Sequence, residues 1–239
     1  MLPADDPLVQ AFTDAVQRGD VDSLVAMLAE HPALATERFG DEQSSRAALH
    51  VATDWPGHFP RVADMIAVLA AAGADVDARF AGPHRETPLH WAASSDDIAA
   101  IDALVAAGAD LEADGGVLTG GPPLDDAIVF SQYAAAHRLV THGARATFWH
   151  AAPLGDVALV RSALASRPAD GIDAEDITNA AWHAARAGRL ATLELLVDAG
   201  ADLTAVLWED RTILDAGVVG GDDAVVRFLR ERGARSNAS

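Results

Sequence analysis

Histidine and carboxylate side chains stand close together in two stretches of the first half of the chain. Asp54 and His58 lie in the first stretch, and His84 and Glu86 lie in the second. A histidine beside a carboxylate can accept and return a proton, which is the chemistry of general acid–base catalysis. The catalytic candidates are therefore His58 and His84, which would exchange protons, with Asp54, Glu86 or Asp126 to orient them.

Large aromatic and cationic side chains accompany these groups. Trp55, Phe80 and Trp91 are candidate anchors, because an exposed aromatic side chain facing a groove often dominates binding. Arg79 or Arg85 would hold an anionic group of a substrate. The full set of ligand-binding candidates is Trp55, Arg79, Phe80, Arg85, Trp91, Phe130 and Tyr133. The simpler alternative for each loop residue is a hydrogen-bonded network that stiffens the loop.

The sequence does not indicate other kinds of site. The chain has no cysteine, which excludes disulfides, thiolate nucleophiles and Cys-ligated metal centres. His150 and His183 could lie near each other, but no third ligand stands at a metal-binding spacing, so no metal is expected. The glycine-rich stretch 114–121 lacks the lysine of a phosphate-binding loop and is interpreted as a flexible loop. We therefore expect no cofactor.

Charge and hydropathy narrow the possible partners. The 239 residues carry 36 acidic and 17 basic side chains, a formal net charge of −19. This charge argues against nucleic acid and anionic membranes, which are bound through basic residues. The first ten residues lack the basic and apolar regions of a signal peptide, and the longest apolar run, Met65 to Ala74, is far shorter than the roughly 18 residues of a membrane helix. We expect a cytoplasmic monomer whose partner is basic or neutral.

Two short sequence marks recur along the chain and define the elements that position these side chains. The first is Gly-Ala followed by Asp or Arg, and it begins at Gly73, Gly108, Gly143, Gly200 and Gly233. The second stands upstream and reads Ala-Ala-Leu-His-Val-Ala from Ala47 and Thr-Pro-Leu-His-Trp-Ala-Ala from Thr87. Aligning the marks predicts units that start near residues 10, 47, 87, 122, 146, 179 and 212. Such units cover nearly the whole chain.

The residue types within a unit explain the marks. A threonine or another small polar residue caps a short helix, and proline fits its first turn. A turn then leads into a second helix with apolar residues at helical spacing, as in Leu190, Leu193, Leu196 and Val197. A glycine in the left-handed conformation ends that helix. Because one unit cannot bury its apolar face alone, the units must stack.

This pattern resembles the ankyrin repeat family. The run from Thr87 to His90, the Gly-Ala-Asp ends and the period of about 33 residues carry the resemblance. The Ala- and Asp-rich composition is similar to that of bacterial stand-alone ankyrin proteins. The resemblance implies an all-α solenoid of helix-turn-helix units joined by β-hairpin-like loops, with residues 1–239 forming one domain. It also implies binding through the loop tips and the concave face of the first helices, and it does not specify a function.

The units depart from the repeat where the candidate residues stand. Residues 53–60 form an insertion within the second unit, where two prolines prevent a helix. The loops at 79–86 and 112–121 are longer than the period predicts. Between the fourth and fifth units the linking loop is nearly absent, because Arg145 runs straight into the next unit. We expect a gap or a bend in the stack there.

One column of the repeat is expected to carry structural side chains. At His50 and His90 the imidazole would bridge backbone groups of neighbouring units. Acidic residues substitute for it in two units, and tryptophans that pack take the same column in two others. The alignment therefore reads this column as His50, His90, Asp125, Trp149, Trp182 and Asp215. The next column, which includes Trp91, Asp126, His150 and His183, would line the groove.

These observations leave three functions open. The predicted one is a binding module in which repeats two to four hold a protein segment or a small ligand in the concave groove. The alternative is an enzyme on the same type of repeat stack, using the acid–base residues of the inserted loops in repeats two and three. A third possibility, a capped structural partner with no groove ligand, has no positive support in the sequence.

Overall fold

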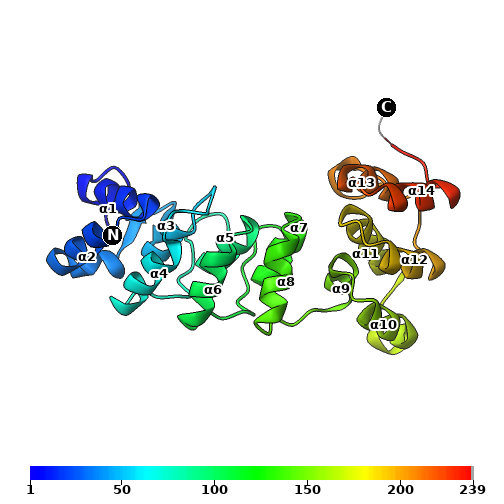
Figure 1. Cartoon of the computed structure of the whole chain (residues 1–239), viewed down its shortest axis with the longest axis horizontal. Helices are drawn as coiled ribbons and strands as arrows, with labels where there is room; N and C mark the ends of the chain where they lie inside the picture. The colour runs from blue at the N-terminus through cyan, green and yellow to red at the C-terminus, as the bar shows by residue number, and fades with distance from the viewer. Residues whose placement is uncertain (238–239) are drawn as a thin grey trace. The chain divides into compact units, whose positions relative to one another are not determined.

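A computed structural model describes residues 1–237 of the chain, without the side chains of residues 168–170. Helices dominate, so the all-α expectation is confirmed (Figure 1). The last two residues of the expected domain, 238 and 239, lie outside the described part. The α-helices are α1 (Pro7–Arg18), α2 (Val21–Glu30), α3 (Ala48–Ala52), α4 (Val62–Ala71), α5 (Pro88–Ser94), α6 (Ile98–Ala106), α7 (Pro123–Val129), α8 (Tyr133–Thr141), α9 (Phe148–Leu154), α10 (Val157–Asp170), α11 (Ala174–Arg186), α12 (Leu190–Asp198), α13 (Ile213–Gly220) and α14 (Asp223–Glu231).

The chain divides into two compact units. The first is Met1–Arg145 and contains α1 to α8, and the second begins at Ala146 and contains α9 to α14. The boundary therefore falls at the position where the sequence has almost no linking loop. Every residue of the candidate site belongs to the first unit.

The first unit is built of two layers of helices. The first helices of the repeats, α1, α3, α5 and α7, contact one another in chain order, and so do the second helices, α2, α4, α6 and α8. Figure 1 shows these helix pairs following one another along the unit. Leucines from both layers form the core and are fully or almost fully buried: Leu49, Leu69, Leu89, Leu104, Leu124 and Leu139. The apolar spacing seen in the sequence thus faces the layer between the helices.

The second unit repeats this arrangement. Helix α11 packs against α9 and α13, and α12 packs against α10 and α14. Its core includes Val160, Leu193, Leu196, Val225 and Leu229, all with no exposed surface. Five of the second helices, α4, α6, α8, α12 and α14, end before glycines with positive φ, between +85° and +107° at Gly73, Gly108, Gly143, Gly200 and Gly233. The predicted role of these glycines as helix stops is confirmed.

The loops contain little strand structure. In residues 1–237 a single two-stranded antiparallel sheet is formed, by β1 (Arg38–Gly40) and β2 (Ser45–Ala47), with Phe39 opposite Arg46. Two short 3-10 helices, η1 (Pro32–Ala35) and η2 (Trp208–Asp210), lie in other connections. Within the glycine-rich loop, Gly115 N–H donates to Gly120 O and Gly116 N–H donates to Gly121 O, each at 3.0 Å. This loop is therefore closed on itself by backbone hydrogen bonds.

The structural column of the repeat is largely as predicted, with one correction. The backbone N–H of Thr87 donates to Nδ1 of His90 at 3.1 Å, and that of Thr212 donates to the carboxylate of Asp215 at 3.0 Å. In the fifth repeat the partner of Thr147 N–H is Nδ1 of His150, at 3.0 Å. His150 therefore occupies the column, and the placement of Trp149 there was wrong by one residue because α9 is capped by Thr147.

The sixth repeat begins earlier than the alignment predicted. Helix α11 starts at Ala174, upstream of the expected position near Asn179. Asp173 caps it, because its carboxylate accepts from the N–H groups of Glu175 and Asp176. This additional turn has no counterpart in the repeat mark, so the periodicity did not reveal it.

Candidate functional site

A pocket of about 250 Å³ opens in the first unit beside α5. It lies between the insertion after α3, the turn after α5 and the glycine-rich loop. Its lining residues are Thr53, Asp54, Trp55, His84, Glu86, Trp91, Ser94, Ser95, Val117 and Phe130. The structure therefore brings together six of the residues predicted from the sequence: Asp54, Trp55, His84, Glu86, Trp91 and Phe130.

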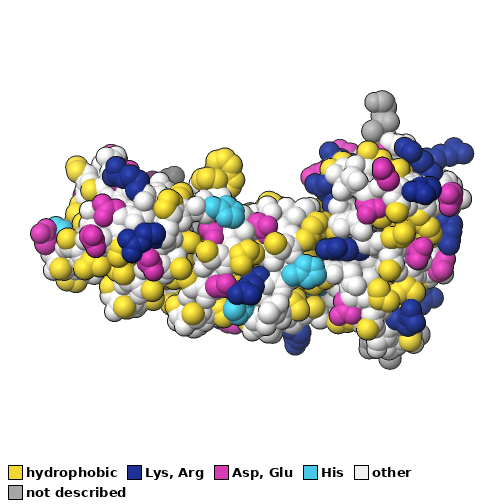
Figure 2. Space-filling model, viewed as in Figure 1, with side chains coloured by type: hydrophobic (Ala, Val, Ile, Leu, Met, Phe, Trp, Pro, Cys, Tyr) yellow, Lys and Arg dark blue, Asp and Glu magenta, His cyan; other side chains and the backbone are white. Residues whose placement is uncertain are grey.

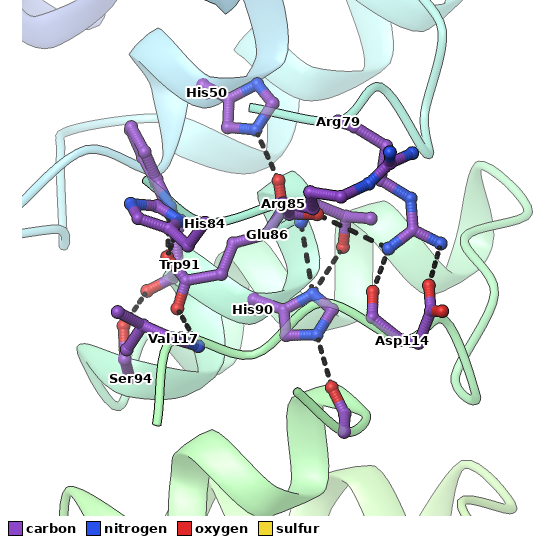
Figure 3. A network of polar contacts seen from close by, with 12 residues as sticks. His50, Arg79, His84, Arg85, Glu86, His90, Trp91, Ser94, Asp114 and Val117 are labelled. Carbon is purple, nitrogen blue, oxygen red and sulfur yellow. Dashed lines mark hydrogen bonds and ion pairs between the residues drawn. The ribbon is translucent and has the colours of Figure 1, made fainter. Parts of the chain in front are cut away.

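The Glu86 carboxylate is the polar centre of this pocket (Figure 3). Its side chain is 6% exposed. Oε2 accepts a hydrogen bond from Trp91 Nε1 at 3.0 Å, and Oε1 accepts one from the backbone N–H of Val117 at 3.2 Å. Nδ1 of His84 lies 2.8 Å from Oε2. These contacts fix the orientation of the carboxylate, because three separate segments of the chain converge on it.

Asp126 lies behind Glu86 and has no exposed surface. Burial raises the pKa of Asp126 to about 9, and the neighbouring Glu86 carboxyl group with its negative charge acts in the same direction. Asp126 therefore keeps its proton at neutral pH. An ideal Cβ on Gly116 would stand 2.7 Å from Asp126 Oδ1. The glycine-rich loop can therefore close over Asp126, which removes it from the groove it was predicted to line.

Aromatic rings support the pocket from behind. The rings of Phe80 and His84 stack, with centroids 4.5 Å apart and an interplanar angle of 18°. The ring of His50 meets that of Trp91 edge-on, with ring centroids 4.8 Å apart, and the ring centroids of Phe80 and Trp91 are 5.6 Å apart. This cluster fixes the position of the Trp91 side chain, so the wall of the pocket is preformed.

Trp55 and Phe130 form the exposed rim of the pocket. Their side chains are 84% and 42% exposed, unlike the buried apolar side chains of the core. In the space-filling view, hydrophobic side chains protrude from the first unit near α3 and α5 (Figure 2). Asp54 completes the rim and forms an ion pair with Arg46. A rim of exposed aromatic side chains beside a polar centre is typical of a binding site.

A second pocket, of about 240 Å³, adjoins the first across Trp91. It is lined by residues of the β1–β2 hairpin and its surroundings: Ala4, Phe39, Gly40, Ser44, Ser45, Arg46, Phe80 and Trp91. Trp91 lines both pockets, so both lie against this residue. Phe80, predicted to bind ligand, belongs to this second pocket.

Besides Phe80 and Asp126, four of the predicted site residues lie outside the first pocket. The N–H of His58 donates to Asp97 at 2.6 Å and its Nε2 lies 2.9 Å from Ser95 O, so His58 fastens the insertion to the next repeat. Arg79 forms an ion pair with Asp114 at 2.8 Å. Arg85 is exposed, and Tyr133 is half-buried at the start of α8. The expected proton exchange between His58 and His84 is not supported by this placement.

Sequence reasoning missed two contributors to the pocket. Val117 was assigned to a flexible loop, yet its N–H binds Glu86 and its side chain lines the pocket. Arg46 was not singled out, although it pairs with Asp54 and lines the second pocket. The sequence signal for Val117 was the pair of glycines at 116 and 121. The structure shows why glycine stands there: an ideal Cβ at residue 116 would lie under 3 Å from Asp126, and one at residue 121 under 3 Å from Asp125.

The histidines of the repeat column have the predicted bridging role. Nε2 of His50 lies 3.1 Å from Glu86 O, and Nε2 of His90 lies 3.0 Å from Gly121 O. Burial lowers the pKa of both, to about 3 for His50. Both are therefore neutral at neutral pH, with Nδ1 as acceptor and Nε2 as donor. Through His50, the backbone of Glu86 is held by the preceding repeat.

Within residues 1–237, no group of three or more His, Asp or Glu side chains is placed to hold a metal ion. In that same part of the chain, no helix has both the length and the apolar character needed to cross a bilayer.

Part of the chain matches a known family, and its fold matches a solved structure. The family model described as "Ankyrin repeat" matches residues 84–113, the segment that includes His84, Glu86 and Trp91. Among curated proteins there is no match. The chain is similar to the human ASB11 ankyrin repeat domain, with a TM-score of 0.55, 19% identity, and coverage of 95% of this chain and 97% of that one. The chain therefore carries an ankyrin repeat at residues 84–113 and has the fold of an ankyrin repeat domain.

Proposed function

We propose that this protein is a binding module that holds a segment of a protein partner in the two pockets beside Trp91. Ankyrin repeats in general mediate protein–protein interactions, which makes this class of function the natural starting point. The observation that carries the proposal is the position of Trp91, which lines both pockets. A partner that places one side chain in each pocket would lie across a single large aromatic side chain, the kind of residue that commonly contributes most binding energy.

The supporting contacts are those that hold the site rigid before binding. Trp91 is fixed by its hydrogen bond to Glu86 and by the rings of His50 and Phe80. Since a preformed site loses little conformational entropy on association, rigidity of this kind favours affinity. Trp55 and Phe130, in contrast, are exposed and free to cover the bound segment.

The enzyme alternative remains a hypothesis with less support. Of the five acid–base candidates, Asp54, His84 and Glu86 line the first pocket. Asp126 is covered by Glu86 and the glycine-rich loop, and His58 bonds Ser95 and Asp97. A proton-transfer mechanism would therefore have to run through Asp54, His84 and Glu86, with Asp126 acting on Glu86 from behind.

The test is a selection of random 12-residue peptides on the immobilised full chain, followed by affinity measurements on variants. We expect Trp55→Ala and Trp91→Ala each to weaken the selected peptides at least tenfold. Trp208→Ala is the matched control, since Trp208 is also exposed but belongs to the second unit, and it should change affinity less than twofold. Peptides that bind both pocket variants as tightly as the unmodified chain would refute the proposal.

A further inference from the structure

We propose that the pocket formed by Glu86, Trp91 and the exposed Trp55 takes the cationic end of a side chain, a lysine ammonium or an arginine guanidinium of the partner. The inference rests on the proposed function and names the chemistry that its first pocket recognises. It is carried by the hydrogen-bonding directions, the charges and the aromatic walls of the pocket, which all favour the same ligand class.

The polar lining of the pocket offers acceptors rather than donors. The hydroxyls of Ser94 and Ser95 both donate to Trp91 O, at 3.1 and 2.7 Å, and that of Thr53 donates to Leu49 O at 3.2 Å. A hydroxyl has a single proton, so each can only accept from a ligand. The N–H groups of Trp91 and Val117 are likewise used by Glu86. The remaining donors of the lining are the indole N–H of Trp55 and the ring of His84. Acceptors therefore outnumber donors, and a ligand rich in N–H groups fits this lining better than a carboxylate or phosphate.

The charged side chains near the pocket also favour a cationic ligand. Asp54 and Glu86 are the acidic side chains in its lining, and His84 is the basic one among the described lining residues. Arg46 forms an ion pair with Asp54. In residues 1–145 acidic side chains outnumber arginines by more than two to one, and Figure 2 shows acidic groups spread over this unit. A cation is therefore attracted both locally and at long range.

The aromatic walls supply the remaining part of a cation site. Trp55 and Phe130 are exposed at the rim, and Trp91 has its indole N–H directed to Glu86. A cation over the face of an aromatic ring is attracted by the ring quadrupole, and tryptophan is the strongest partner. The volume of about 250 Å³ is below the usual range for small-molecule sites, which suits one side-chain end rather than a cofactor.

The chain itself has no lysine, since all 17 of its basic residues are arginines. A lysine ammonium in this pocket would therefore come from the partner. The primary amine of the chain itself is its amino terminus. This composition also makes the chain suitable for carbodiimide coupling, which joins a carboxylate to an amine. A coupled product between Glu86 or Asp54 and a lysine-containing peptide would report direct contact with little internal coupling.

The experiment is a titration of the ¹⁵N-labelled full chain, followed through the indole N–H signals of Trp55 and Trp91. The probes are N-acetyl-arginine amide, N-acetyl-lysine amide and, as the neutral isostere, N-acetyl-citrulline amide. We expect the two cations to shift both signals and to bind at least tenfold more tightly than the citrulline compound. Glu86→Gln should weaken the cations at least fivefold, while Glu30→Gln, an exposed site with the same change in charge, should not.

A second variant covers the case in which Glu86→Gln disturbs folding. Trp55 is largely exposed, so Trp55→Ala should leave the spectrum of the core unchanged and weaken the cations at least threefold. Equal binding of the citrulline and arginine compounds would overturn the cation inference and leave the binding site in place. Selected peptides that bind without shifting the indole N–H signal of Trp55 or Trp91 would overturn the cation inference and the proposed function together.

Discussion

The indole N–H of Trp91 donates to the buried carboxylate of Glu86 over 3.0 Å, and these two residues join the repeat fold to the candidate site. Glu86 immediately precedes Thr87, the N-cap of α5, and its backbone carbonyl lies 3.1 Å from Nε2 of His50 in the preceding repeat. Trp91 follows His90, whose ring lies in the same repeat column as that of His50. The residues that hold the repeats together are thus direct neighbours of those that form the pocket.

The first prediction concerns the bridging histidine His90. Replacing it with alanine leaves the N–H of Thr87 without its partner and removes one of the two hydrogen bonds to Gly121 O, the other coming from Gly116 N–H. An unsatisfied buried group costs about 1–3 kcal/mol, and a lost hydrogen bond adds about 1 kcal/mol. We expect His90→Ala to lower the free energy of unfolding of the chain by about 3 kcal/mol, as measured by urea denaturation. His31→Ala, at an exposed histidine, is the control. Equal stability of the two variants would show that the bridge does not hold the repeats.

The second prediction concerns the proton held by Asp126. Aspartate titrates near 3.9 in an unfolded chain, whereas burial raises the pKa of Asp126 to about 9 in the folded protein. The folded state therefore binds more protons between these values, and the contribution of this group to stability falls as pH rises from about 4 to about 9. Asp126→Asn imitates the protonated acid and removes this dependence. Its stability relative to the unmodified chain should increase with pH, by up to roughly 1.4 kcal/mol per unit. A difference that stays constant with pH would contradict the raised pKa.

The third prediction concerns acid sensitivity in the second unit. Burial, with a smaller contribution from His150, lowers the pKa of His183 to about 4. The unfolded chain binds this proton near pH 6.5, so the stability is present above that pH and is lost as pH falls towards 4. The loss amounts to about 3 kcal/mol, and His183→Gln should remove most of it in unfolding experiments at pH 7 and pH 4.5. Identical losses in both proteins would refute this assignment.

The fourth prediction concerns the contact of Gly116 with Asp126. A Cβ at residue 116 would stand 2.7 Å from Asp126 Oδ1 and 3.1 Å from Gly121 O, closer than normal packing allows. We expect Gly116→Ala to destabilise the chain by about 1–3 kcal/mol, the usual cost of overpacking. In the background of Asp126→Ala the penalty should become smaller, because the contacted oxygen is removed. A full penalty in both backgrounds would place the strain elsewhere in the loop.

Much of the fold was predictable because repetition makes local signals add up. Thr87, His90 and the glycines after the second helices each have a local physical role, and seeing that role several times removes the ambiguity of a single occurrence. The same repetition located the pocket, because Trp55, His84 and Glu86 stand in segments that break the period. Where the marks are weak, as at His150 and Ala174, the alignment was off by one or several residues.

The remaining features depend on contacts between distant segments. Asp126 was expected in the groove because of its column, but the loop carrying Gly116 closes over it. His58 was expected in the pocket, but its ring and backbone bond Ser95 and Asp97 in the next repeat. No local rule predicts the path of a loop with an irregular length. For this reason the sequence indicated which residues gather near the site but not which of them face it.

The most direct test of the proposed binding site uses the five tryptophans of the chain as reporters. A peptide selected on the full chain is titrated into ¹⁵N-labelled protein, and the five indole N–H signals are followed. The proposed binding site predicts shifts of the Trp55 and Trp91 signals, whereas the signals of Trp149, Trp182 and Trp208 in the second unit should not shift. Shifts confined to the three tryptophans of the second unit, with Trp55 and Trp91 unchanged, would contradict it.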